Sequence, residues 1–400
     1  MRELKQNLLI KIAICSFYIV ILFDFITKVL LIYSNDTFSK FSFIPKVVIL
    51  CTMLFVCFYL GTKQKIKFII LYTLMFFFAV LAYLNLYLDF QLKTLYKQLY
   101  SLLLYSYPFI LVSFFNVIGK NNRRAIILSL EKHILIIGVI SSILIFIGLI
   151  TKIELFRSYS FSNRFGYNGI FLKTSEASYF YICLLLLCLY LFNNKYKLLF
   201  IISTLLSSLL VGTKVVWLSI FLIILIYSFK KYKKTTAIFL LIPITVYFNF
   251  RQKIDSYLIE LWPRGEILYN ENGIITILTS TRDILLERTI LFSKENWSFI
   301  NYLFGGNKYW LHKVEFEFID LFFLFGIFGI IIFYLFLKNR FINRLQGSFS
   351  KYTLIIILIC AFFAGNFFKS FLSFTVFYLV FEIIILKEKK LLYDKTSKIK

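Results

Sequence analysis

Long apolar runs without a single charged residue recur along this chain of 400 residues, and they constrain its fold more than any other feature. The stretch 98–118 is one example, because it contains no Asp, Glu, Lys or Arg. A helix needs about 20 mostly apolar residues to cross the hydrocarbon core of a bilayer. Since 60% of all residues are hydrophobic and only 16% are charged, the sequence predicts an all-α polytopic membrane protein.

The apolar runs predict twelve transmembrane helices within a single integral membrane domain, residues 1–400. We place these helices at 8–32, 42–60, 68–88, 98–118, 133–150, 174–192, 197–213, 213–229, 235–250, 316–337, 352–368 and 371–386. The stretch 198–229 is long enough for one span. The alternative is a hairpin of two short helices that turn at Gly212. The hairpin is expected because it places the basic clusters before and after this stretch on the same face of the membrane. Lys214 would then lie below the membrane surface.

The positions of Lys and Arg predict the orientation. The formal net charge is +25, but the basic residues occur as small clusters between apolar runs, which is typical of cytoplasmic loops rather than of a nucleic-acid surface. The loops on the side of the N-terminus are more than twice as dense in Lys and Arg as those on the other side. We therefore expect both termini in the cytoplasm, a basic cytoplasmic tail over 387–400, and no nucleic acid as a partner.

One connection is much longer than the others, and the orientation places it outside the cytoplasm. It covers 250–316 and contains the segments WPRG, TRDILLER and GGNKYWLHKVE, of which TRDILLER is expected to form a helix. Trp262 and Trp310 lie in this loop, and Arg264 follows Trp262 closely. Their flat faces suit stacking against sugar rings, and ordinary packing within the loop is the alternative.

Common soluble enzyme motifs are absent from the sequence: it has no P-loop, no G-x-G-x-x-G, no H-E-x-x-H and no G-x-S-x-G. His133 and His312 are its two histidines, and its six cysteines all lie within apolar runs without the spacing of a zinc or redox site. We expect neither a metal nor a cofactor.

Several ionisable residues lie at or within the predicted spans, where charge is costly and usually faces a partner or a cavity. Asp24 and Lys28 are four residues apart in the first span and are expected to pair on one helix face. Others lie at span ends on the predicted outer side: Glu176, Lys214, Glu317 and Asp320. These four residues can form ion pairs between helices or line a site, and the sequence does not decide between the two.

Four segments occur in an order that resembles the Wzy-type O-antigen and capsule polymerases, a family related to the O-antigen ligases. The segments are RFGYNGIFLKTSEASYF, LLVGTK, LTSTRDILLERTI and YLFGGNKYWLHKVEFEFIDLFFLFGIFG, and they extend from Arg164 to Gly329. The resemblance implies a GT-C-like membrane glycosyltransferase that joins lipid-linked oligosaccharides on the outer face of a bacterial inner (plasma) membrane.

The resemblance also implies which residues do the chemistry. Glycan transfer from undecaprenyl diphosphate builds negative charge on the departing diphosphate, and basic side chains can stabilise that charge without a metal. A carboxylate whose pKa is raised towards neutrality can accept the proton of the attacking hydroxyl. The catalytic candidates are Arg164, Lys214 and Arg282 as cations, and Glu315 and then Glu176 as bases. The candidates for substrate binding are His312, Asp320, Trp262, Trp310 and Arg264.

We therefore expect a polysaccharide polymerase that moves a growing undecaprenyl-diphosphate-linked glycan onto an incoming lipid-linked repeat unit. A chain-length regulator and the lipid bilayer are its other expected partners. An O-antigen ligase is the first alternative, although His312 is followed by Lys313 where the ligase branch often has Asn. A flippase without chemistry is the second alternative, and the long outer loop argues against it.

Overall fold

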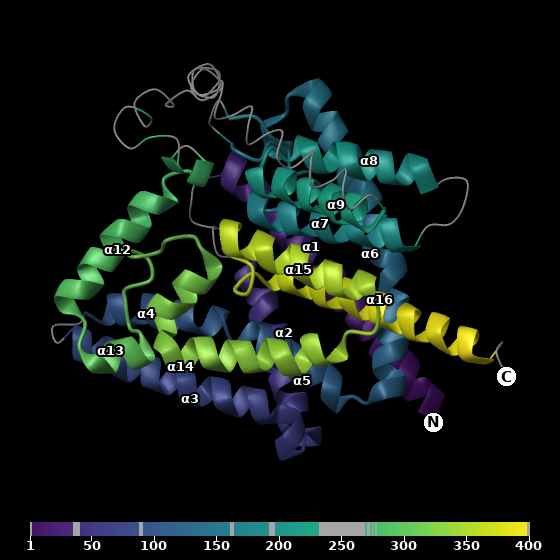
Figure 1. The fold of residues 1–400 in the computed structure, drawn as a ribbon. Coiled ribbons are helices and arrows are strands. Elements are labelled where there is room, and N and C mark those ends of the chain that lie inside the picture. The colour runs from purple at the N-terminus through teal and green to yellow at the C-terminus, as the bar shows by residue number, and fades with distance from the viewer. Residues whose placement is uncertain are drawn as a thin grey trace.

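A computed structural model of the chain describes residues 2–34, 41–87, 91–160, 164–191, 197–231 and 278–397, together with residues 269, 273, 275 and 276. In these ranges almost every regular element is a helix, and the one β contact is an isolated antiparallel bridge between Arg157 and Tyr167. Figure 1 shows the helices packed lengthwise against one another. The all-α class expected from the sequence is confirmed.

The helices follow the apolar runs of the sequence. Their bounds are α1 Arg2–Tyr33, α2 Phe43–Leu60, α3 Lys63–Leu86, α4 Leu92–Leu104, α5 Tyr107–Val117, α6 Lys120–Thr151, α7 Thr174–Leu191, α8 Lys197–Leu210, α9 Lys214–Lys231, α12 Arg282–Asn296, α13 Phe299–Phe304, α14 Glu317–Arg340, α15 Ser348–Ala364 and α16 Phe371–Ser397, with short 3₁₀ turns at Glu154–Phe156 and Ile342–Arg344.

Seven segments are long and apolar enough to cross a membrane: Leu9–Tyr33, Phe43–Leu60, Lys63–Leu86, Leu92–Val117, Lys120–Thr151, Thr174–Leu191 and Glu317–Arg344. Three shorter apolar helices, Leu198–Leu210, Lys214–Ser228 and Ser348–Ala364, accompany them. These features fit a polytopic membrane protein. The predicted span 235–250 lies outside the described residues, and the number of twelve spans and the GT-C-like fold stay predictions.

Two local breaks shape the bundle. The segment Leu92–Val117 bends between α4 and α5, where Pro108 follows the first residue of α5, a place that tolerates proline because the amide there has no helical partner. The expected hairpin is present as well, because α8 ends at Leu210 and α9 begins at Lys214.

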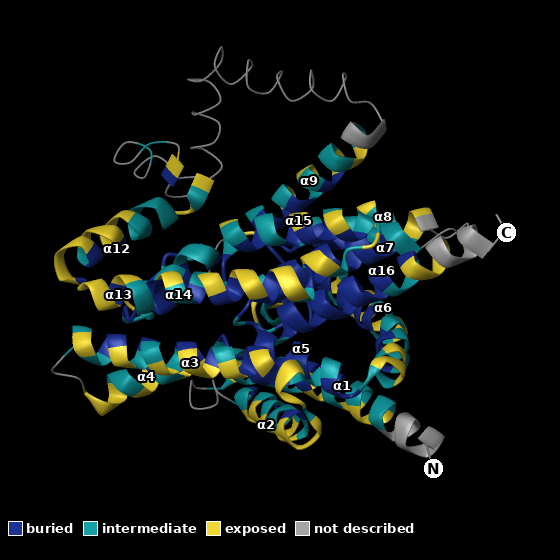
Figure 2. Ribbon diagram, turned by 60° about the horizontal axis from the view of Figure 1, so that its bottom comes forward, coloured by how far each residue is buried: buried dark blue, intermediate teal, exposed yellow. Residues whose placement is uncertain are grey.

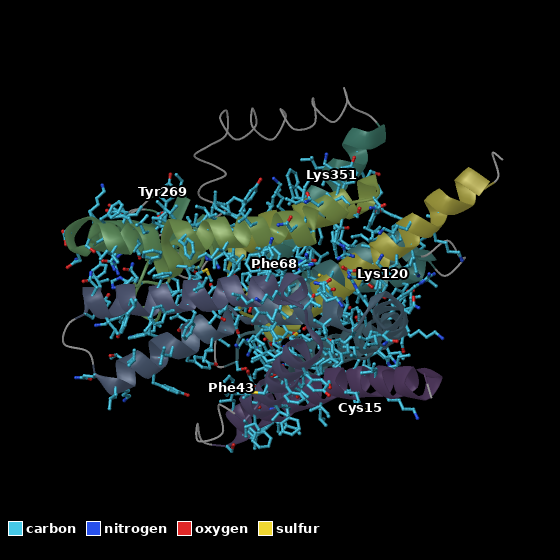
Figure 3. All side chains as sticks on the ribbon, turned by 90° about the horizontal axis from the view of Figure 1, so that it is seen from below. Cys15, Phe43, Phe68, Lys120, Tyr269 and Lys351 are labelled. Atoms are coloured by element: carbon cyan, nitrogen blue, oxygen red, sulfur yellow. The ribbon has the colours of Figure 1, made fainter. Side chains whose placement is uncertain are left out.

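Both chain termini lie at the same end of the bundle, which we call the termini end (Figure 1). We call the opposite end the Arg282 end; it holds the described parts of the connections 152–173, 211–213, 278–316 and 365–370. Figure 3 shows Lys120 and Lys351 towards the termini end and Tyr269 towards the Arg282 end. The shared end fits the prediction that both termini face the same side, and the cytoplasmic assignment stays a prediction.

The most buried helices are α7 and the first half of α16, which pack against each other at the centre of the bundle. In α7 every residue from Glu176 to Cys188 is buried. By contrast, α2 exposes large apolar side chains such as Phe55 and Tyr59 (Figure 2). Exposed apolar side chains on peripheral helices are the arrangement expected where lipid replaces water around a protein.

The expected pairing of Asp24 with Lys28 is wrong. Lys46 of α2 donates a hydrogen bond to Asp24 at 2.6 Å. Lys28 instead donates to the side-chain oxygen of Asn168 at 2.5 Å and to the carbonyl oxygen of Gly169 at 2.7 Å. Because both groups find partners on another helix or loop, the spacing of four residues along α1 does not decide the pairing.

Candidate functional site

The loop that carries Arg164 is packed directly on the tip of the α8–α9 hairpin. Gly212 has a φ of 75°, and a Cβ atom on it would lie 2.4 Å from the carbonyl oxygen of Phe165. Gly166 approaches from the other side, where a Cβ atom would lie 2.5 Å from the carbonyl oxygen of Val211. Only glycine permits this approach of two backbones. The contact holds the Arg164 loop against the start of α9.

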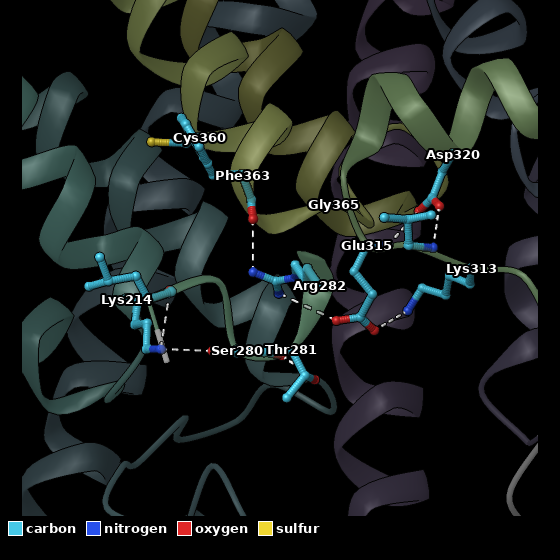
Figure 4. A network of polar contacts seen from close by, with 12 residues as sticks. Lys214, Ser280, Thr281, Arg282, Lys313, Glu315, Asp320, Cys360, Phe363 and Gly365 are labelled. Carbon is cyan, nitrogen blue, oxygen red and sulfur yellow. Dashed lines mark hydrogen bonds and ion pairs between the residues drawn. The ribbon is translucent and has the colours of Figure 1, made fainter. Parts of the chain in front are cut away.

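Lys214 links this tip to the segment that precedes α12. Its Nζ donates a hydrogen bond to Ser280 Oγ at 2.8 Å and to the carbonyl oxygen of Leu278 at 3.2 Å (Figure 4). Ser280 and Thr281 have φ values of 59° and 69°, in the left-handed region that side chains disfavour. Strained backbone of this kind is kept where the surroundings fix it, and it often accompanies function. The bend positions Arg282 as the first residue of α12.

Arg282 lies at the centre of the polar network in Figure 4. One terminal nitrogen donates to the carbonyl oxygen of Phe363 at 2.8 Å, and the other lies 3.3 Å from Glu315 Oε2. Its Nε is buried and has no hydrogen-bond partner among the described residues. The second carboxylate oxygen of Glu315 pairs with Lys313. Glu315 is therefore held between two cations.

The backbone of Glu315 is also unusual, with a φ of 69°. Gly365 packs on it so closely that a Cβ atom there would lie 2.7 Å from the carbonyl oxygen of Glu315. Asp320 supports the same turn, because its two carboxylate oxygens accept hydrogen bonds from the backbone N–H groups of Val314 at 2.7 Å and Glu315 at 3.2 Å. Asp320 thus shapes the site through the backbone.

The protonation behaviour of Glu315 differs from the expectation. Burial alone would raise the pKa of this carboxyl, but the positive charges of Lys313 and Arg282 outweigh it and hold the pKa below its usual value. A carboxylate with a lowered pKa is a weak proton acceptor near neutral pH. The expected raised pKa is wrong, and an ion-pairing role suits this side chain better.

Arg164 faces the same region from the side of the hairpin. Its guanidinium carbon lies 4.1 Å from the ring centre of Tyr159. Burial raises the pKa of the Tyr159 phenol, while the charges of Arg164 and Arg282 both lower it. Both guanidinium groups therefore act on one phenol although they are far apart in sequence. We define the Arg282 cluster as Arg164, Lys214, Arg282, Lys313 and Glu315.

Glu176, the second predicted base, belongs to a different group. Its side chain is 1% exposed in α7, and Ser370 Oγ donates a hydrogen bond to it at 3.2 Å. Its other carboxylate oxygen has no hydrogen-bond partner among the described residues. Its hydrogen-bond partner therefore comes from the connection 365–370.

His312 and Trp310, two further predicted substrate-binding residues, pack against different helices. His312 stacks on Phe292 of α12 with ring centres 4.0 Å apart, and burial, followed by the charge of Lys308, lowers its pKa. Trp310 packs near Lys97 of α4, with 5.7 Å between the ammonium group and the ring centre. Trp262 and Arg264 lie outside the described residues.

Sequence reasoning missed two cations at this end of the bundle. Lys313 completes the pairing of Glu315, and Lys369 donates a hydrogen bond to the phenol oxygen of Tyr309. The available signal for Lys369 was its place as the one cation in the short connection 365–370 between two apolar runs. Nothing in the sequence distinguishes it from an ordinary interfacial lysine, because its partners come from distant segments.

The Arg282 cluster brings four cations and one carboxylate together from three separate regions of the chain. Arginine guanidinium groups bind phosphate oxygens in a bidentate manner, and lysine adds a point charge, so the cluster is suited to an anionic phosphate group. Within the described ranges no group of three or more His, Cys, Asp or Glu residues could hold a metal ion. No family model matches the chain, and neither characterised proteins nor solved structures gave a significant match.

Proposed function

We propose that the chain is a polymerase of surface polysaccharide. It transfers a growing glycan from undecaprenyl diphosphate to a sugar hydroxyl of an incoming lipid-linked repeat unit, on the outer face of a bacterial plasma membrane. In this proposal the Arg282 end is the outer end. The observation that carries the proposal is the convergence of Arg164, Lys214 and Arg282, which come from three distant segments of a helical, membrane-type protein.

The proposed chemistry follows from the charges of the cluster. The leaving diphosphate gains negative charge as its bond to the sugar breaks, and preorganised cations stabilise charge that develops in the transition state. One terminal nitrogen of Arg282 lies 3.3 Å from Glu315 Oε2, which is long for a charge-assisted hydrogen bond. A phosphate oxygen can compete for this contact, since charge-assisted bonds to guanidinium are normally shorter, about 2.7–2.9 Å.

A flippase is the second candidate, and one observation favours it. Asp24, Lys28, Lys46 and Glu176 place ionisable groups inside the bundle, and such groups mark ion or substrate pathways in transporters. Each of these groups has a partner that also suits a purely structural role: Asp24 pairs with Lys46, and Lys28 binds Asn168.

The test is a deletion of the gene followed by electrophoresis of the surface lipopolysaccharide, or the equivalent capsule assay. Loss of a polymerase leaves the lipopolysaccharide core capped with a single repeat unit, and complementation restores the long-chain ladder. Loss of a ligase or a flippase leaves core without any repeat unit. The second pattern would reject the proposed polymerase.

A further inference from the structure

The connection 365–370 at the Arg282 end is fixed by the start of α14. Glu317 is fully buried, and its two carboxylate oxygens accept hydrogen bonds from the backbone N–H groups of Phe367 and Phe368, each at 2.9 Å. Gly365 packs against the backbone of Glu315 at the beginning of the same connection. The connection that carries Lys369 is therefore held in place at both of these points, and its first residue contacts the backbone of Glu315.

Lys369 lies in this fixed connection and forms no ion pair with a carboxylate of the described residues. Its Nζ donates a hydrogen bond to the phenol oxygen of Tyr309, and the same ammonium group lies 4.4 Å from the centre of that ring. The carboxylates of Glu317 and Asp320 are already engaged with backbone N–H groups.

The charges around Lys369 come from three elements, and they explain its protonation. The pKa of Lys369 is lowered to about 7, mainly by burial and then by the charge of Lys313, while the charges of Glu317 and Asp320 oppose the shift. Burial also raises the pKa of the Tyr309 phenol well above its usual value, so the phenol stays protonated. The titratable groups that act on Lys369 are Tyr309, Lys313, Glu317, Asp320 and Lys173.

We propose that Lys369 is the general base that accepts the proton of the attacking sugar hydroxyl, with Tyr309 as the residue that positions its amine. This inference rests on the proposed polymerase function. It gives Lys369 the role of general base, for which Glu315 is poorly suited because two cations hold Glu315 in its charged form. Glu315 instead keeps Arg282 and Lys313 in place beside the leaving group.

The proposed step balances as follows. The acceptor hydroxyl transfers its proton to the neutral Nζ of Lys369 while its oxygen forms a bond to the anomeric carbon of the donor sugar. The bond between that carbon and the diphosphate oxygen breaks, and its electron pair leaves with the diphosphate. Lys369 becomes an ammonium group, and the negative charge appears where Arg164, Lys214 and Arg282 can bind it.

The experiment uses the full-length protein in proteoliposomes and the lipid-linked repeat unit extracted from the deletion strain. Initial rates of chain growth are measured between about pH 5.5 and 9. The wild-type rate should rise with pH through about 7, because Lys369 must lose its proton to act. Lys369→Arg keeps the positive charge but cannot deprotonate at these pH values. We expect this variant to lose about 100-fold or more in rate at pH 8.

Lys93→Arg is the matched control, since Lys93 is exposed in α4 and lies outside the proposed machinery. Tyr309→Phe should lower the rate less than Lys369→Arg and should shift the midpoint of the pH profile, because it removes the hydrogen-bond partner that positions the amine. Mass-spectrometric measurement of lysine acetylation against pH gives the pKa of Lys369 without any need for activity.

The outcomes separate the two proposals. Absence of chain growth by the wild-type protein would reject the polymerase itself. If the wild-type protein extends chains and Lys369→Arg does so with the same rate and pH profile, the general-base role is rejected. The proposed polymerase function is unaffected by that result. Such a result would reduce Lys369 to a positive charge near the substrate.

Discussion

Two carboxylates in this molecule each lie between two cations, and they differ in almost every other respect. Glu315 pairs with Arg282 and Lys313 at the Arg282 end, and its side chain is 36% exposed. Glu382 pairs with Arg123 and Arg344, and its side chain is 1% exposed. Glu382 lies inside α16, whereas Glu315 lies in a turn with positive φ.

The comparison teaches that the same set of charges can serve two purposes. The cations around Glu382 come from α6 and from the turn after α14, so the buried pairs join three elements. The carboxylate of Glu315 is partly exposed, and one of its contacts is as long as 3.3 Å. We interpret the first group as structural and the second as a site that a ligand can enter.

The largest expected effect is on stability at the buried group. Glu382→Gln leaves two guanidinium groups without their carboxylate, and removal of one partner of a buried pair costs about 3–5 kcal/mol. The matched variant Glu315→Gln should cost less than about 1 kcal/mol, because its pairs are partly exposed. Thermal unfolding of both purified proteins in detergent is the measurement. Equal losses would contradict the distinction between the two groups.

The next effect is on activity at the exposed group. Arg282→Ala should reduce chain growth by about 100-fold or more, because it removes a cation aimed at the developing negative charge. Arg282→Lys should restore only part of the rate, since lysine keeps the charge but lacks the two-nitrogen fork. Ladder formation in the complemented deletion strain, normalised to protein level, is the measurement. A full ladder from Arg282→Ala would remove Arg282 from the mechanism.

A smaller effect is expected at the contact between the Arg164 loop and the hairpin. Gly212→Ala adds a Cβ atom 2.4 Å from a backbone oxygen at a φ of 75°, so we expect a cost of at least about 1–3 kcal/mol and a reduced rate of chain growth. Gly119→Ala is the control, because Gly119 has a φ of 84° but nothing lies within 4 Å of the added atom. If both variants behave alike, the close approach of the two segments has no role.

The smallest effect concerns pH. The pKa of Glu315 is lowered in the folded protein, so its ion pairs stabilise the fold above the unfolded pKa of about 4.3 and this contribution is lost as pH falls through the lower folded value. The difference in unfolding free energy between wild type and Glu315→Gln should therefore shrink below about pH 4. A difference that does not change with pH would show that the pairs do not contribute to stability.

The sequence predicts the helical class, the hairpin at Gly212 and the helix that begins at Arg282, because apolar runs and their breaks act locally. It also suggested three cations that the structure places near one another at one end of the bundle. It could not predict the partners of charges. Asp24 pairs with Lys46 rather than Lys28, and Arg282 pairs with Glu315, because the packing of the chain decides which groups meet.

Lys369 shows the same limit for chemistry. Its sequence neighbours are Phe368 and Ser370, and nothing in them indicates a lowered pKa. The shift arises from burial and from Lys313, which lies in a different connection. Conversely, the raised pKa expected for Glu315 is wrong because two cations close on it in the folded chain. The local sequence shows where a charged residue lies along the chain but not which groups surround it in the fold.

The most direct test compares Arg282→Ala with Arg344→Ala in one assay, the rate of chain growth per folded molecule in proteoliposomes. Each variant removes one arginine from a carboxylate that is held by two cations. We predict that Arg282→Ala folds normally and loses about 100-fold or more in rate, whereas Arg344→Ala is produced at a lower level but keeps its rate per molecule within about threefold. A normal rate for Arg282→Ala would contradict the assignment of the Arg282 cluster as the site of transfer.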